Sequence, residues 1–203
     1  MGKAVQHFFT LTDTVDRGPV VLLVQEKSGL LPILYIHQIA HSILQYFHLG
    51  IKGFPDKSLA ADQAIENAAL NGLQDRVRFQ CADVFELLPR LESRGESYDV
   101  VILDPPAFTK SRSSVKNAVK GYREINLRGL KLVRDGGYLA TCSCSHFMEP
   151  ELFAKTIREA AAGARKRLRQ VEFRTQGADH PILWAADQSY YLKFYIFQVV
   201  NER

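Results

Sequence analysis

Two short segments of the sequence combine residue types that could carry out chemistry on a bound substrate. In the first, Asp104-Pro105-Pro106, a carboxylate directly follows the apolar run Tyr98–Leu103. Two prolines after an aspartate stiffen the backbone and hold the carboxylate at the tip of a strand. A rigid turn with a solvated aspartate is the simpler interpretation. A buried strand that ends in a fixed carboxylate nevertheless favours a binding or catalytic role.

The second segment is Thr141–Ser145, which reads TCSCS and contains two of the three cysteines of the chain. Cys142 falls within the predicted strand Tyr138–Cys142 and is expected to be a small buried apolar side chain. Cys144 lies just beyond that strand, where a thiol can face a cleft and have its pKa lowered. Cys144 is therefore the candidate nucleophile of the chain.

Two further carboxylates, Asp56 and Asp83, follow the predicted strands Ile51–Pro55 and Val77–Cys81. Each has a purely structural interpretation, since Asp56 can cap a helix and Asp83 can organise a turn. In open parallel sheets, however, ligands bind outside the carboxyl ends of the strands. Polar side chains at successive strand ends therefore predict one shared site.

Strand-like and helix-like segments alternate along the chain, which predicts a doubly wound α/β fold with a mostly parallel sheet. Besides the strands named above, Pro19–Val24 is a predicted strand, and Arg169–Arg174 and Tyr191–Val200 predict a C-terminal antiparallel hairpin. The predicted helices are Leu30–Leu49, Leu59–Leu70, Val84–Leu91, Tyr122–Leu132 and Pro150–Arg167. Neither a repeat nor a linker divides the sequence, so residues 1–203 are interpreted as a single domain.

Composition narrows the class of protein. The chain has 203 residues, of which 46% are hydrophobic and 24% charged, as in an ordinary globular domain. Its net charge of +4 gives only a mild preference for polyanions, and part of it comes from a basic cluster predicted at a helix end, namely Arg165, Lys166, Arg167 and Arg169. Three irregularly spaced cysteines argue against a disulfide framework and a metal site, and indicate a cytoplasmic protein. The apolar stretch Leu30–Leu49 carries too many His and Gln residues for a membrane span.

Four sequence segments carry a family resemblance: VILDPPAF at 101–108, GYREINLRGLKL at 121–132, GGYLATCSCSH at 136–146 and ADHP at 178–181. In order and spacing they resemble the bacterial 23S ribosomal RNA cytosine-5 methyltransferases, from about Asp56 to Val200. The resemblance implies a Rossmann-like class I methyltransferase fold, S-adenosylmethionine as methyl donor and RNA as partner. It leaves open whether the protein forms a homodimer.

The resemblance also implies residue roles. The family's ribose-binding acid matches Asp56, its adenine-contacting acid matches Asp83, its aspartate beside the target base matches Asp104, and its nucleophile matches Cys144. The full set assigned to the cofactor is Asp56, Asp83, Val84, Asp104, Pro105, Glu26 and Gly29. The set assigned to the substrate is Pro106, Phe108, Lys110, Arg112 and His180.

A cysteine is needed because C5 of cytosine is too weak a nucleophile to attack a methyl sulfonium unaided. Addition of Cys144 to C6 makes C5 enamine-like and able to accept the methyl group. Asp104 is expected to bind the N3/N4 edge of the base and to stabilise the charge that develops on the ring.

The first third of the chain departs from the family pattern. The segment Val24–Gly29 contains one glycine where a glycine-rich cofactor loop is expected. Either Glu26 and Gly29 form a divergent loop, or roughly Val5–Phe54 replaces the family sequence through a deletion or a shifted reading frame. The small RNA-binding domain that often precedes this catalytic domain is not expected in the chain.

Two rival functions remain open. Asp-Pro-Pro followed by an aromatic residue is used by methyltransferases that grip exocyclic amines, although here Ala107 displaces Phe108 from that position. The other rival is a degenerate, non-catalytic methyltransferase fold that serves as an RNA-binding or assembly module. The altered first loop favours this second rival.

Overall fold

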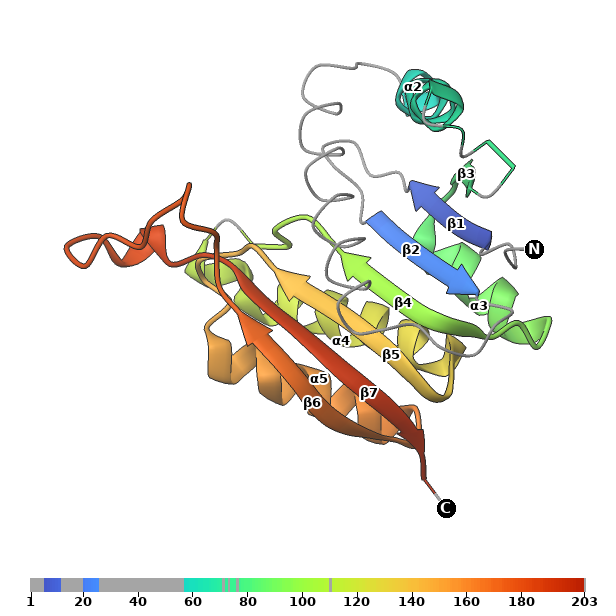
Figure 1. Ribbon diagram of the computed structural model, residues 1–203. Coiled ribbons are helices and arrows are strands. Elements are labelled where there is room, and N and C mark those ends of the chain that lie inside the picture. The colour runs from blue at the N-terminus through green and yellow to red at the C-terminus, as the bar shows by residue number, and fades with distance from the viewer. Residues whose placement is uncertain are drawn as a thin grey trace.

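The computed structural model describes residues 6–11, 20–25, 57–70, 72, 74–75, 77–109 and 111–202. Within these ranges the chain forms a seven-stranded sheet of order β3-β1-β2-β4-β5-β7-β6 (Figure 1). Its strands are β1 (Gln6–Leu11), β2 (Val20–Gln25), β3 (Val77–Cys81), β4 (Tyr98–Asp104), β5 (Val133–Ser143), β6 (Lys166–Arg174) and β7 (Lys193–Asn201).

The sheet is mixed. β4 and β5 are parallel neighbours, and so are β1 and β3, whereas β2 runs antiparallel to both β1 and β4. β7 runs antiparallel to β5 and β6, which confirms the predicted C-terminal hairpin. The α/β alternation also agrees with the prediction. The sheet contains more antiparallel pairings than predicted, because an apolar run such as VVLLV indicates a buried strand but not its direction.

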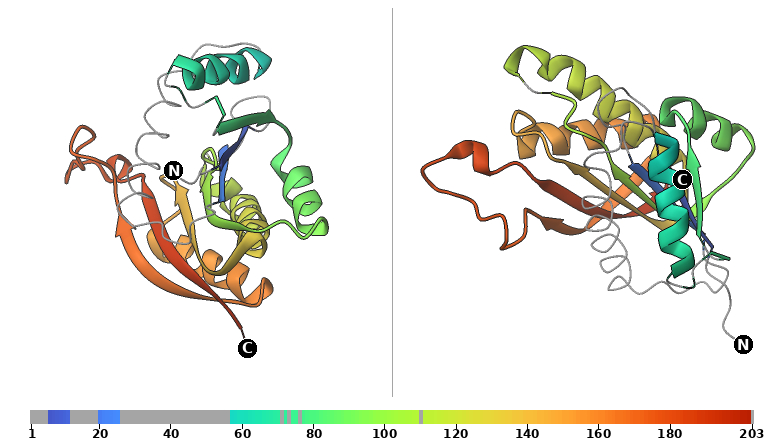
Figure 2. Two further views of the ribbon diagram at one scale, coloured as in Figure 1. Left: turned by 45° about the vertical axis from the view of Figure 1, so that its right-hand side comes forward. Right: turned by 90° about the horizontal axis from the view of Figure 1, so that it is seen from above.

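Four helices accompany the sheet in the described ranges: α2 (Lys57–Leu70), α3 (Val84–Ser93), α4 (Val115–Leu132) and α5 (Pro150–Gly163). The last three lie side by side on one face of the sheet, whereas α2 lies beside the edge strand β3 (Figures 1 and 2). Glu92 of α3 pairs with Arg128 and Lys131 of α4, at 3.5 and 2.7 Å. The predicted helix Leu30–Leu49 and strand Ile51–Pro55 lie outside the described residues.

The core forms where α4 crosses β4. Every residue of Tyr98–Leu103 is buried, as expected of a strand in the middle of a sheet. α4 presents Tyr122, Ile125 and other apolar residues at helical spacing to this strand. A Cβ added at Gly129 would lie 2.9 Å from a Leu103 methyl carbon, so a larger residue there would force the Leu103 side chain to shift.

The end of α5 corrects one prediction. The helix ends at Gly163 rather than at Arg167, Arg165 adopts a left-handed backbone conformation (φ 54°), and β6 begins at Lys166. The basic cluster therefore opens an edge strand instead of closing a helix. Cross-strand pairing with β7 along the whole of β6 outweighs the helical propensity of these Lys and Arg residues.

Two smaller differences concern the limits and the number of the elements. α4 begins at Val115, about two turns before the predicted start at Tyr122, and β1 has no counterpart among the predicted strands. Gly72 has a positive φ of 65° just after α2, as predicted for a helix-closing glycine. Among the described residues, no helix combines the length and the hydrophobicity needed to cross a bilayer.

Candidate active site at the ends of the central strands

The carboxyl ends of β3, β4 and β5 lie at the same edge of the sheet, because the two antiparallel pairings of β2 leave these strands pointing in one direction. β3 is followed by Asp83, β4 ends in Asp104, and β5 is followed by Cys144. Three of the four predicted strand-end side chains are thus brought to one edge. The fourth, Asp56, lies outside the described residues.

Asp104 and Cys142 form the inner part of this edge. The Cys142 thiol is buried and donates to Asp104 Oδ1 at 3.0 Å and to the Leu103 carbonyl at 3.7 Å. Burial raises the pKa of Cys142 well above its ordinary value, and the negative charge of Asp104 raises it further. Cys142 is therefore a protonated donor that orients the Asp104 carboxylate.

Cys144 lies further out and is half-buried. Burial and the Asp104 charge raise the pKa of its thiol, whereas backbone hydrogen bonds at Cys144 and Ala107 and the positive charge of Lys193 lower it. The net direction is upward, opposite to the direction predicted from its position in the sequence. A strand end alone does not reveal that a carboxylate on the neighbouring strand faces the thiol.

A buried polar network holds the two segments together. Ser145 Oγ donates to the Thr109 carbonyl at 3.0 Å, and Ser143 Oγ donates to the Tyr122 hydroxyl at 2.9 Å. That hydroxyl in turn donates to the Pro106 carbonyl at 3.5 Å. The Phe108 ring packs on Tyr122 with centroids 4.7 Å apart. Asp104 and Cys144 are thus carried by two loops whose relative position is determined by packing and hydrogen bonds.

Lys193 is a residue of this site that the sequence patterns did not single out. It opens β7 opposite Ser143, is only 1% exposed, and its ammonium donates to the carbonyls of Ser145 at 2.5 Å and Tyr191 at 2.8 Å. Burial lowers its pKa to about 8, against an opposing effect of the cysteine thiols. The available signal was a lysine inside the apolar run YYLKFYIF, since lysines are almost never fully buried without a reason.

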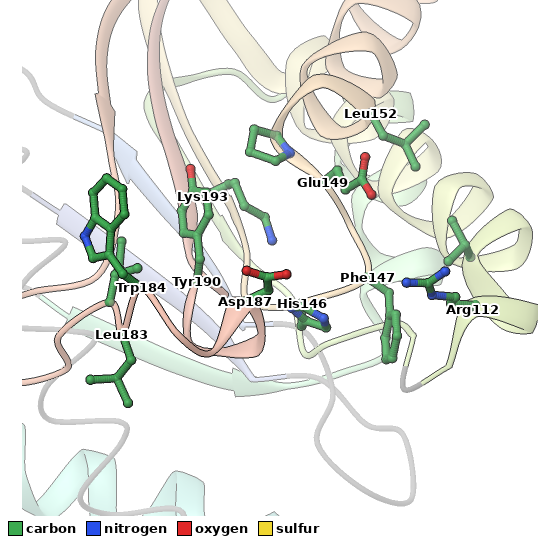
Figure 3. A pocket seen from close by; sticks show the side chains of 13 residues that line it. Arg112, His146, Phe147, Glu149, Leu152, Leu183, Trp184, Asp187, Tyr190 and Lys193 are labelled. Carbon is green, nitrogen blue, oxygen red and sulfur yellow. The ribbon is translucent and has the colours of Figure 1, made fainter.

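Lys193 lines a cavity of about 730 Å³, whereas Asp104 and Cys144 are not among its lining residues. Figure 3 shows the Lys193 amine pointing between a wall formed by the β6–β7 loop and a wall formed by the segments that begin α4 and α5. Exposed Arg112 lies on the second wall. His146 also lines the cavity, and its buried Nδ1 has no hydrogen-bond partner among the described residues.

The β6–β7 loop carries an exposed tryptophan. Trp184 is 99% exposed and lines the cavity. The turn that carries it is braced from within the loop, because Leu183 N–H donates to Ser189 Oγ at 2.8 Å and Ala186 N–H donates to the Leu183 carbonyl at 2.9 Å. The predicted substrate residue His180 is exposed on the same loop and pairs with Asp179 at 3.1 Å, but it is not among the residues that line this cavity.

The remaining predicted site residues fall into two groups. Asp83 is the N-cap of α3, accepting from Phe85 N–H at 2.8 Å, and the adjacent Val84 is buried in the core. Pro105 is buried beside Asp104, and Pro106 and Phe108 are half-buried. Predicted residues outside the described ranges are Glu26, Gly29, Asp56 and Lys110. No cluster of three metal-ligating side chains occurs in the part of the chain that the structure describes.

The direction of β2 contradicts the predicted position of the cofactor loop. A cofactor loop was predicted at the carboxyl end of this strand. β2 runs antiparallel to β4 and pairs Val20 with Asp104, so its last residue, Gln25, lies at the opposite edge of the sheet. The amino end of β2, not its carboxyl end, approaches Asp104.

Two solved structures share the fold. One, described as a methyltransferase complexed with SAH, has a TM-score of 0.60 and 20% identity, and covers 70% of this chain and 37% of its own. The other, described as a SAM-dependent methyltransferase from Streptococcus mutans, has a TM-score of 0.59 and 19% identity, and covers 70% and 36%. Together with the α/β sheet, they confirm a Rossmann-like methyltransferase fold.

Curated relatives are closer in sequence. Ribosomal RNA large subunit methyltransferase I of Shewanella denitrificans is 41% identical over 192 residues, which are 94% of this chain and 48% of that protein. The Erwinia tasmaniensis protein of the same name is 39% identical over 147 residues, 71% of this chain and 37% of its own. The chain thus spans about half the length of these relatives or less. A family model for S-adenosylmethionine-dependent methyltransferases matches residues 56–190, more than half of the chain, and the chain belongs to that family.

Proposed function

We propose that this chain acts as an S-adenosylmethionine-dependent methyltransferase that forms 5-methylcytosine in large-subunit ribosomal RNA, with Cys144 as a transient covalent nucleophile. The observation that carries the proposal is the meeting of Asp104 and Cys144 at one edge of the sheet. Family membership and the names of the curated relatives support the same reaction class and the same type of RNA.

The proposed reaction has three steps: addition of Cys144 to the base, transfer of the methyl group, and elimination of Cys144. The Cys144 thiolate forms a bond to C6 of the cytosine, and the electron pair of the C5–C6 double bond becomes available at C5. S-adenosylmethionine, when bound, supplies an electrophilic methyl group on a sulfonium sulfur. C5 would take that methyl group as the carbon–sulfur bond breaks, and the sulfur would keep the bonding electrons as the neutral thioether of S-adenosylhomocysteine. Transfer of the C5 proton to a water molecule then re-forms the double bond and expels Cys144 as a thiolate.

Asp104 supports this reaction through its position. Its carboxylate is oriented by the Cys142 thiol and lies close enough to Cys144 to raise the pKa of that thiol. A carboxylate held there can accept a hydrogen bond from the N4 amino group of cytosine and, when protonated, can donate one to N3. Fixed groups of this kind stabilise charge that develops on a ring during reaction.

The described residues fit one side of a methyl-donor site. Asp83 is exposed at the end of β3, on the same edge as Asp104, and a carboxylate has acceptor capacity beyond its single helix-capping hydrogen bond. Adenosine offers amino and hydroxyl donors that such acceptors bind. Pro105, which directly follows Asp104, is buried and supplies an apolar surface there. Asp56, Glu26 and Gly29 stay predicted cofactor contacts.

One observation favours a second candidate. Because the carboxyl end of β2 lies at the far edge, β2 does not deliver a cofactor loop to Asp104. This arrangement is the one expected of a degenerate methyltransferase fold that binds RNA or assembles without catalysis.

Calorimetric titration with S-adenosylmethionine and with S-adenosylhomocysteine separates the two candidates. Saturable binding of both ligands, together with transfer of labelled methyl groups to large-subunit ribosomal RNA, is expected for the enzyme. A folded protein that binds the RNA but neither ligand would instead identify the non-catalytic module.

The exposed tryptophan at the cavity supplies a prediction about RNA binding. Replacing Trp184 by alanine is expected to weaken binding of large-subunit ribosomal RNA about fivefold or more, because stacking of a base on an aromatic side chain contributes roughly 1–3 kcal/mol. Filter binding at one fixed salt concentration measures the effect. Trp184→Phe should retain most of the affinity, and Leu70→Ala, which removes another highly exposed apolar side chain on α2, should retain all of it. Equal affinity of Trp184→Ala and the unchanged protein would exclude this contact.

A further inference from the structure

Lys193 is an unusual cation for its surroundings. In the part of the chain with described side chains, it is the only lysine or arginine that is buried. Among the ion pairs of the described residues, none involves Lys193. A buried ammonium without a countercharge is costly, so its retention calls for an anionic partner.

In the described part of the chain, the groups that accept hydrogen bonds from the ammonium carry no formal charge. The carbonyls of Ser145 and Tyr191 accept two of its three N–H donors. The groups whose negative charge favours the protonated form of Lys193 are Cys144 and Cys142, in their thiolate forms. Cys142 already donates a hydrogen bond to Asp104 and is buried, so it is unsuited to ionise. Cys144 is the remaining candidate.

We propose that Lys193 is the counter-cation of the Cys144 thiolate and thus a positioning residue for the nucleophile. The proposal rests on the proposed function of Cys144 in methyl transfer. The hydrogen bond from the ammonium to the Ser145 carbonyl ties the cation to the backbone directly after Cys144. The ammonium also faces the cavity that adjoins the site, where the proposed substrate base would approach (Figure 3).

The charges around Cys144 come from several elements. Asp104 at the end of β4 opposes formation of the thiolate, and Lys193 at the start of β7 favours it. The other titratable groups that interact with Cys144 or line the cavity are Cys142, Tyr122, Tyr191, Tyr190, His146, Glu149, Asp187 and Arg112. Among the described residues, Lys193 is the cation whose charge lowers the pKa of Cys144. Its charge therefore offsets part of the increase in the Cys144 pKa that the Asp104 carboxylate causes.

The effect of Lys193 on the Cys144 thiolate depends on pH, because only the charged ammonium stabilises the thiolate. Lys193 is mainly charged below its pKa of about 8 and loses its charge above it. Its stabilisation of the Cys144 thiolate is therefore present at neutral pH and disappears as the pH rises above about 8. Removing the ammonium is expected to raise the pKa of Cys144 further above its ordinary value.

The test is the pH profile of Cys144 alkylation by iodoacetamide, resolved from Cys81 and Cys142 by fragment mass spectrometry. In Lys193→Met, alkylation of Cys144 at neutral pH is expected to be about tenfold slower than in the unchanged protein, and the difference should shrink above pH about 8, where Lys193 loses its charge. Lys193→Arg, which keeps the charge, should largely restore the profile. The matched control is Lys166→Met, because Lys166 is a half-buried lysine of the same hairpin and donates to the Val133 carbonyl and to Asn201 Oδ1.

A reciprocal measurement leaves residue 193 unchanged and remains informative if Lys193→Met does not fold. In Cys144→Ala, the midpoint for acetylation of Lys193 by acetic anhydride is expected to fall, because the ammonium has lost its anionic partner. Unchanged alkylation profiles in Lys193→Met, or an unchanged Lys193 midpoint in Cys144→Ala, would overturn the proposed pair. Neither result would contradict the proposed role of Cys144 in methyl transfer. Full methyl transfer by Cys144→Ala would instead overturn the proposed function.

Discussion

Replacement of Cys144 by serine is expected to lower methyl transfer by at least about 10³-fold, because a hydroxyl is a far weaker nucleophile toward C6 than a thiolate. Labelled methyl transfer from S-adenosylmethionine to large-subunit ribosomal RNA measures the loss. RNA that contains 5-fluorocytidine gives a second measurement. Fluorine at C5 cannot leave as a proton does, so the covalent protein–RNA adduct should accumulate on a denaturing gel with the unchanged protein and be absent with Cys144→Ser.

Cys142→Ser is the matched control, since Cys142 lies two residues away and is buried against Asp104. A serine hydroxyl retains a donor toward the carboxylate, so this variant should keep most of the methyl transfer and form the adduct. The reverse pattern, with Cys142 essential and Cys144 dispensable, would contradict the assignment. Full activity of both variants would favour methylation of an exocyclic amine, which needs no cysteine.

Asp104→Asn is expected to have the second largest effect. The substitution keeps the shape of the side chain but removes the charge that raises the pKa of Cys144. Two results should therefore move in opposite directions. Alkylation of Cys144 at neutral pH should become faster, because its pKa falls, whereas methyl transfer should drop about 10²–10³-fold as the group that binds the base loses its function.

Asp135→Asn is a suitable control, because Asp135 is an exposed carboxylate near the amino end of β5 and accepts a hydrogen bond from Asn201 N–H. It should change neither the alkylation profile nor methyl transfer. Faster alkylation together with undiminished methyl transfer in Asp104→Asn would show that Asp104 influences the thiol but has no part in the reaction. Such a result would remove Asp104 from the proposed mechanism.

Much of the architecture could be predicted from the sequence because local patterns determine it. The continuous apolar run at Tyr98–Leu103 predicted a buried strand, and the two prolines after Asp104 marked its end, as the structure confirms. Gly72 closes α2 as its conformational freedom suggested. The contrast between a buried Cys142 and a more exposed Cys144 also follows from their positions within and after one strand.

The tertiary structure decided features that depend on which segments become neighbours. Strand direction is one of them: the apolar pattern at Val20–Gln25 indicates burial equally well in either direction, and only its pairing with β1 and β4 shows that it is antiparallel. The ionisation of Cys144 is another, because its pKa depends on Asp104 and Lys193, which are far from it in the sequence. Periodicity and turn chemistry act over a few residues, whereas charge, burial and strand pairing act across space, and so the sequence by itself identified the candidate nucleophile but not the charges that surround it.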